Sequence, residues 1–336
     1  MYKANLLNNI NTISNNKVKE FEALIYTNRF IASSSIEAGY GDNISLFGHL
    51  KKAGEYLPRE LGSVDGNLKG LSSPENRVPP FLRSQLFIAL IASIEDYLSQ
   101  IMKEVLVSYP EKIGVKTTES SNIINSGDVK EIIELMAEKH ITDTLYKKPE
   151  DYKKSFIEII SADKDLLNIY WDSFIEMKAT RDAGMHGGWR SNSIYIRKAG
   201  LKSRTNIAGE FLPITVDYFN ESVNVCKGIV NVIHNHIKQK FNKCTPAYVF
   251  SEMWENSSLS SIVPFNDAWL IQTSNMVRPK NGFKWGWSTS EEMLYKFFLG
   301  IYEGEETMPF LPRLLERLNN NDSNIIKLWL SSPFFF

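Results

Sequence analysis

The sequence has few cysteines and almost no net charge, and both features limit what the protein can be. Only two cysteines, Cys226 and Cys244, occur in 336 residues, which excludes a disulfide framework and a cysteine-rich zinc site and favours a reducing compartment. Lys and Arg number 38 against 39 Asp and Glu, so no overall positive charge attracts the chain to nucleic acid or to an anionic membrane. Any such attraction must come from a local patch.

Three further signals are missing from the sequence. No run approaches the roughly 18 apolar residues of a membrane span, and the start, MYKANLLNNINTISNN, lacks the apolar core and cleavage site of a signal peptide. No carboxylates or histidines have metal-ligand spacing, since His234 and His236 are two residues apart and point to different faces of a helix. We therefore expect a cytoplasmic protein that does not contact membranes and uses neither a metal nor a cofactor.

Apolar residues recur at helical spacing through the middle of the chain. From Phe81 they follow three- and four-residue steps, which predicts a long amphipathic helix ending near Tyr109 and Pro110. Further helices are predicted over 128–139, 149–160 and 167–177, and a closing one runs from Val216 to Phe241. Residues 80–243 are therefore predicted to form an all-helical bundle of four or five helices.

The two flanking regions have weaker patterns. Residues 1–79 contain one predicted helix, around 18–36, and then a stretch rich in Gly, Ser and Pro, typical of an extension or adaptor. Residues 244–336 are mixed: AWLIQ resembles a strand, a capping box from Ser288 to Glu291 starts a helix, and FLPRLLERL starts another. This region is acidic on balance, and its closing FFF favours docking into a groove of this chain or of a partner. We interpret 244–336 as a regulatory region that could bind a protein partner or inhibitor.

Two tryptophans in the C-terminal region leave two interpretations open. Trp285 and Trp287 alternate across a glycine in KWGW. They could form half of an aromatic ligand pocket, or a strand could pack both rings on a core.

The stretch KATRDAGMHGGWR combines an arginine and a histidine five residues apart. On a continuous helix Arg181 and His186 would differ by about 140° in azimuth, so we expect the helix to end between them. Gly184 and the Gly187–Gly188 pair would then let the imidazole turn back toward the guanidinium. A permanent planar cation beside a group that titrates near neutral pH fits phosphodiester chemistry. The alternative is an ordinary helix-end cation and a capping histidine.

The sequence RDAGMH resembles the Arg-polar-spacer-His motif of the HEPN superfamily of helical-bundle ribonucleases and nucleotide-binding domains, with Arg181, Asp182 and His186 in the matching places. The layout of residues 80–243 is also similar: a long first helix, the motif on a later helix, glycines after the histidine and a closing helix. Asp182 stands where asparagine is commoner. The resemblance implies a mainly α fold, with a HEPN-like bundle, an N-terminal extension and a smaller mixed or helical C-terminal region.

The resemblance also implies an activity. A HEPN ribonuclease cleaves RNA without metal, by attack of the 2′-hydroxyl on the neighbouring phosphate. His186 would be the general acid or base, Arg181 would stabilise the phosphate charge, and Asp182 would orient one of them. Glu95 resembles the acidic position that often faces the motif, and two chains would pair as a homodimer. Such nucleases often act as toxins or in antiphage defence. The alternatives are a non-catalytic HEPN module, which binds RNA or a nucleotide and dimerises within a larger complex, and a structural adaptor.

A basic loop follows the motif. No acidic residue occurs between Asp182 and Glu210, while cations alternate with aromatic residues there. Cations that follow phosphates and rings that stack on bases are typical of single-strand binding. The predicted RNA-binding residues are Trp189, Arg190, Tyr195, Arg197, Lys198, Lys202 and Arg204. The alternative is a solvated hairpin, formed in part by SIYIRKAG, whose aromatic side chains pack on the bundle.

Overall fold

The computed structural model describes residues 3–37, 80–114, 129–273, 275–280, 287–304, 308–331 and 333–336, and within these ranges the protein is mainly α. The chain forms two compact units. One consists of Thr12–His236, and the other combines Met1–Asn11 with Ile237–Phe336. Among the described residues, no helix has both the length and the apolar content that crossing a bilayer requires.

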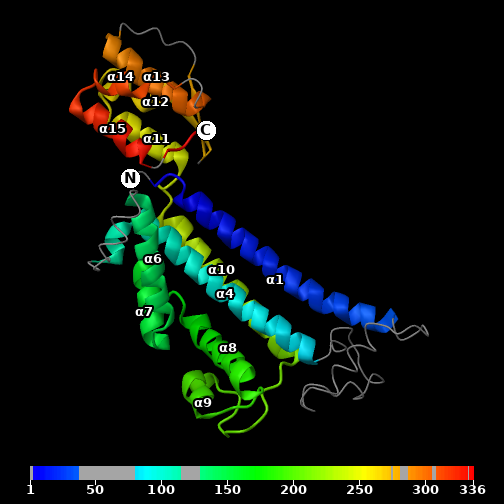
Figure 1. Cartoon of the computed structure of the whole chain (residues 1–336). Helices are drawn as coiled ribbons and strands as arrows, with labels where there is room; N and C mark the ends of the chain where they lie inside the picture. Colours follow the sequence, from blue (N-terminus) through cyan, green and yellow to red (C-terminus); the bar gives the residue numbers. More distant parts are fainter. Residues whose placement is uncertain are drawn as a thin grey trace. The chain divides into compact units, whose positions relative to one another are not determined.

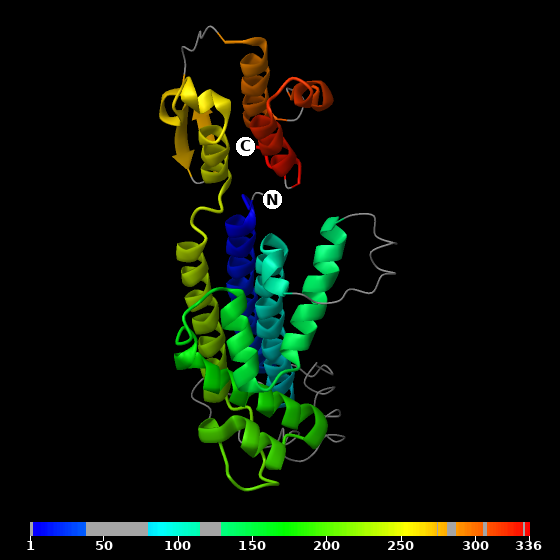
Figure 2. The same cartoon turned by 90° about the vertical axis from the view of Figure 1, so that its left-hand side faces the viewer.

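Three long helices form the first unit's core: α1 (Leu6–Glu37), α4 (Pro80–Ser108) and α10 (Val216–Lys240). They lie side by side in both views (Figures 1 and 2). The apolar stripe of α4 is buried as its spacing predicted, and α4 ends before Pro110, which begins a 3₁₀ turn (η4, Pro110–Ile113). A buried contact of 3.2 Å between Ser14 Oγ and Tyr97 Oη joins α1 to α4.

The N-terminal helix differs from the prediction in extent and in place. It begins at Leu6 rather than near residue 18. From Thr12 onward it belongs to the helical unit, where Lys17 Nζ pairs with Asp96 Oδ2 of α4 at 3.1 Å. The boundary expected between residues 79 and 80 therefore differs from the observed division, because α1 supplies part of the bundle core. The rest of the predicted extension, 38–79, lies outside the described residues.

The other helices of this unit carry the candidate site. They are α6 (Val129–Leu145), α7 (Pro149–Ile159), α8 (Asn168–Gly187) and α9 (Ser193–Ala199), with a 3₁₀ turn, η5 (Gly200–Lys202), after α9. The prediction for α7 is confirmed, with Pro149 and two acidic residues in its first turn. The expected hairpin in SIYIRKAG is wrong, because this segment is α9, whose cap Asn192 accepts a hydrogen bond of 2.8 Å from the Tyr195 amide.

The second unit combines short helices with one hairpin. Its elements are α11 (Pro246–Glu255), η6 (Ser258–Ser261), α12 (Phe265–Ala268), β1 (Trp269–Thr273), β2 (Met276–Pro279), α13 (Thr289–Glu303), α14 (Leu311–Leu315) and α15 (Asn320–Leu330). The strands are antiparallel, with Ile271 opposite Val277. The predicted strand and the Ser288–Glu291 capping box are confirmed.

The core of the second unit is aromatic. Phe250 contacts Trp269 with ring centroids 4.8 Å apart, and Trp254 contacts Phe298 at 5.1 Å. The chain end closes this core, because Phe334 is buried and the Phe336 ring lies 5.3 Å from Phe250. Docking of the terminal phenylalanines on this chain is thereby confirmed.

The two tryptophans of KWGW are described only in part. Trp287 packs on Tyr295 at 4.5 Å, as the core interpretation expects, while Trp285 lies outside the described residues.

Candidate functional site

The predicted motif residues belong to a chain of alternating charges between α4, α8 and α9. Glu95 of α4 pairs through one oxygen with Lys178 Nζ at 2.7 Å and through the other with Arg181 Nη2 at 3.0 Å. Arg181 Nε also lies 3.1 Å from Asp182 Oδ1, and Asp182 Oδ2 lies 3.1 Å from Lys198 Nζ. The structure thus brings together three of the four predicted catalytic residues, Glu95, Arg181 and Asp182.

Solvent reaches this network. The side chains of Lys178, Arg181 and Glu95 are 18%, 23% and 22% exposed. Since the two cations are three residues apart on α8, they share one helix face and hold Glu95 between them. The carboxylates fix the guanidinium without enclosing it, so an anion can still approach Arg181.

Lys178 is a site residue that the sequence interpretation missed. Its ammonium lies 5.1 Å from the centre of the buried Tyr152 ring and 5.6 Å from that of Phe174. Burial and the Glu95 charge raise the pKa of Tyr152, so its hydroxyl stays protonated. The spacing of Lys178 and Arg181 on a predicted helix was the available signal, since it puts both cations on one face.

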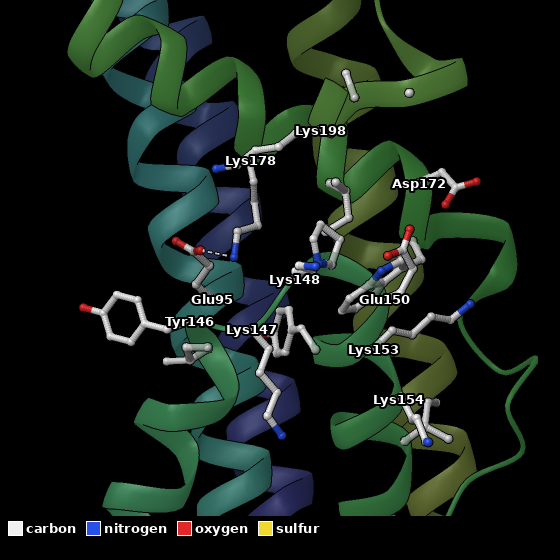
Figure 3. A pocket seen from close by; sticks show the side chains of 18 of the residues that line it. Glu95, Tyr146, Lys147, Lys148, Glu150, Lys153, Lys154, Asp172, Lys178 and Lys198 are labelled. Carbon is white, nitrogen blue, oxygen red and sulfur yellow. Dashed lines mark ion pairs between the residues drawn. The ribbon is translucent and has the colours of Figure 1, made fainter. Parts of the chain in front are cut away.

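This network forms part of an open cleft of about 1830 Å³, whose walls come from α4, the α6–α7 turn, α7, α8, α9 and η5 (Figure 3). Its lining is rich in cations. They are Lys147, Lys148, Lys153, Lys154, Lys164, Lys178, Arg181, Arg197 and Lys198, against the carboxylates Glu95, Glu150, Glu158, Asp172 and Asp182. Nine positive charges against five negative ones give an excess of four, which attracts a polyanion such as a phosphate backbone.

Several of these cations are available to a ligand. Within the described part of the chain, the side chains of Lys148, Lys154, Lys164 and Arg197 make no hydrogen bond or ion pair. Two other lysines have polar partners without charge, Ser155 for Lys147 and Asn168 for Lys153. A phosphate group would therefore gain attraction without first breaking an ion pair to these side chains.

His186 does not join Arg181, and the prediction that the helix ends between them is wrong. Helix α8 continues through Gly187 and ends at Gly188, whose φ of 60° and ψ of 37° are left-handed. The two side chains therefore lie about 140° apart around one continuous helix. His186 is exposed and does not line the cleft.

Gly184 lies inside helix α8, where it makes room for a tryptophan ring. A Cβ atom at this position would lie 2.7 Å from indole atoms of Trp189. The glycine therefore lets the buried ring pack against the helix and does not break it. Trp189 also contacts Phe87 of α4, with ring centroids 6.4 Å apart.

Three of the predicted RNA-binding residues are structural instead. Trp189 is buried as described, and the Tyr195 hydroxyl, also buried, donates to Glu176 Oε1 at 2.9 Å. Arg204 Nε donates to the same oxygen at 3.2 Å, and its guanidinium lies 4.0 Å from the centre of the Tyr218 ring. Trp189 and Tyr195 are too buried to contact RNA, so assigning RNA contacts to them is wrong; the Arg204 side chain is bound to the buried carboxylate of Glu176 and is 22% exposed.

The other predicted RNA-binding residues divide into two pairs. Arg197 and Lys198 of α9 line the cleft. Arg190 donates to the Gly209 carbonyl at 2.9 Å, and it and the exposed Lys202 lie outside the cleft lining. The cleft lysines of the α6–α7 connection were missed, although the sequence YKKPEDYKK was a visible signal.

Among the described residues, no group of three or more His, Cys, Asp or Glu side chains is placed to hold a metal ion. Comparisons with protein-family models, curated proteins and solved structures give no match.

Proposed function

We propose that this chain is a metal-independent endoribonuclease of the HEPN type, which binds the RNA phosphate backbone in the basic cleft. The observation that carries the proposal is the position of Arg181. Glu95 and Asp182 hold it in a cleft that has an excess of positive charge. Arginine held in this way is suited to a phosphate group, because its planar donors match two phosphate oxygens.

The proposed reaction is an in-line displacement at phosphorus. The ribose 2′-oxygen attacks the adjacent phosphorus, the bond to the 5′-oxygen breaks, and the products carry a 2′,3′-cyclic phosphate and a 5′-hydroxyl. Arg181 and Lys178 stabilise the negative charge on the phosphoryl oxygens, and loss of one such group commonly costs about 10²–10³-fold in rate. His186 acts as the general base that takes the 2′-hydroxyl proton or as the general acid that gives a proton to the leaving 5′-oxygen, a role worth about 10²–10⁴-fold in rate.

The position of His186 requires a second copy of the chain. Because His186 and Arg181 lie on different sides of α8, they contact one phosphate only if the histidine comes from a partner. Exposed apolar side chains within and after the motif favour such pairing: Met185, Ile194, Leu201 and Ile207. Sedimentation checks this homodimer, since a chain that cleaves RNA as a monomer would exclude the two-chain site.

The cellular assignment is part of the same proposal. A role as a toxin or antiphage effector is supported by the resemblance alone. A cytoplasmic location is supported by the few cysteines, and binding of a protein partner or inhibitor by the C-terminal region is supported by its acidic balance.

Cleavage of total cellular RNA by the purified protein in excess EDTA tests the function. The wild type should produce fragments with cyclic phosphate ends, and His186→Ala should slow cleavage about 10²–10⁴-fold. A His236→Ala variant, altered on α10, serves as the control. Cleavage that requires added Mg²⁺, or that persists unchanged in His186→Ala, would contradict the proposal.

A second candidate function is binding without cleavage. The separation of His186 from Arg181 favours it, because a module that only binds RNA or a nucleotide needs the cleft cations and not the histidine. In that case the wild type would bind RNA in the cleavage assay and leave it intact.

A further inference from the structure

An aromatic side chain lies exposed at the basic cleft. Tyr146 is 88% exposed and lines the cleft. It belongs to the short connection between α6, which ends at Leu145, and α7, which begins at Pro149. Figure 3 shows its ring projecting away from the ribbon of this connection. An exposed ring at the edge of a cleft is accessible to a ligand.

The backbone around Tyr146 is held in place. Its amide donates to the Thr142 carbonyl at 3.3 Å, and the Lys147 amide donates to the Thr144 carbonyl at 3.2 Å. Lys147 Nζ also donates to Ser155 Oγ of α7 at 2.7 Å. By contrast, the Tyr146 side chain makes no hydrogen bond or ring contact within the described residues. The connection thus positions a ring that has no such contact among the described residues.

The charges beside the ring indicate which ligand would use it. Lys147 and Lys148 follow Tyr146 directly and line the same cleft, with Lys178 and Arg181 further along its wall. Cations that bind phosphates, beside a ring with an open face, form the combination that binds unpaired nucleotides.

We propose that Tyr146 is a base-stacking residue of the cleft, and that it gives the cleft a preference for an unpaired nucleobase over a duplex. In a duplex, neighbouring base pairs cover both faces of each base, so Tyr146 would have nothing to stack on and only the phosphate contacts would remain. The inference rests on the RNA-binding part of the proposed function and is independent of cleavage.

The test compares a single strand with a duplex of the same length, both made of 2′-O-methyl RNA, whose blocked 2′-oxygen prevents cleavage. Fluorescence anisotropy with the full chain gives the affinity for each. Tyr146→Ala should weaken single-strand binding by about 5- to 100-fold, the range of one base–aromatic stack. Binding of the duplex should change by less than about twofold.

Three control variants make the comparison specific. Tyr146→Phe and Tyr146→Trp should keep the preference, because they keep a ring. Tyr26→Ala removes another exposed tyrosine, on α1 and outside the cleft lining, and should change neither affinity.

The outcomes separate this inference from the proposed function. Equal binding of both RNAs by the wild type, or an equal loss of affinity for both in Tyr146→Ala, would overturn the stacking role and leave the basic cleft standing. A wild type that binds neither RNA would overturn both.

Discussion

Helix α8 carries two networks of acidic and basic residues, and they differ in what they leave exposed. On one face, Arg181 pairs with Glu95 in an open cleft that has more cations than carboxylates. Elsewhere on the helix, Glu176 is buried and binds Tyr195, Tyr218 and Arg204 at 2.9, 2.7 and 3.2 Å. Both arginines come from the basic stretch around the motif. The two arginine side chains are almost equally exposed, at 23% and 22%, so the burial of the partner carboxylate, 22% exposed for Glu95 and 5% for Glu176, separates a candidate ligand contact from a structural one.

Breaking the buried network should have the largest effect. Glu176→Ala leaves the buried Tyr195 hydroxyl, the part-buried Tyr218 hydroxyl and Arg204 without the carboxylate that they share, so the free energy of unfolding should fall by about 3–5 kcal/mol. Urea unfolding followed by circular dichroism measures this decrease.

The same substitution in the open network, at Glu95, should destabilise the fold less than the one at Glu176. Glu95→Ala should cost about 1 kcal/mol in the same urea experiment, because the ion pairs of Glu95 are partly solvated. Equal decreases in Glu176→Ala and Glu95→Ala would contradict the distinction between a buried structural network and an open one.

Reversing charge in the cleft should affect binding and leave the fold intact. The triple change Lys148→Glu, Lys154→Glu and Lys164→Glu alters side chains without protein partners among the described residues. The slope of log affinity for single-stranded RNA against log salt should fall by about 2, at about 0.7 for each phosphate that the protein no longer neutralises.

The control for this triple change reverses cations elsewhere. Lys19→Glu, Lys202→Glu and Lys238→Glu change total charge equally, at exposed positions outside the cleft lining. The salt slope of this control should stay close to that of the wild type. Equal salt slopes for the two triple variants would mean that RNA does not bind along the cleft.

Local patterns predicted most of the helices, because each long helix repeats its apolar residues along one face. The spacing in α4 and α10 and the proline of α7 were sufficient. The hairpin expected in SIYIRKAG was wrong, since Asn192 caps a helix there. Gly184 was misinterpreted as a helix breaker, because its packing partner Trp189 becomes evident only in the folded chain.

The candidate site was predictable only in part. The arginine and its acidic neighbour were found from the motif, and Glu95 from its similarity to a family position. The cleft itself depends on the approach of the α6–α7 connection to α8 and α9, which no local pattern contains. For the same reason, the binding of Tyr195 and Arg204 to Glu176 could not be foreseen, because it depends on contacts between separate elements.

Protection of lysines by bound RNA shows whether the basic cleft is the RNA site. Acetylation of surface lysines, with and without saturating 2′-O-methyl single-stranded RNA, can be read at each lysine by mass spectrometry. RNA should protect Lys148, Lys154 and Lys198, which line the cleft, while Lys19 and Lys238 should react equally in both samples. Protection at Lys19 and Lys238, with the cleft lysines still reactive, would contradict the assignment of this cleft as the RNA site.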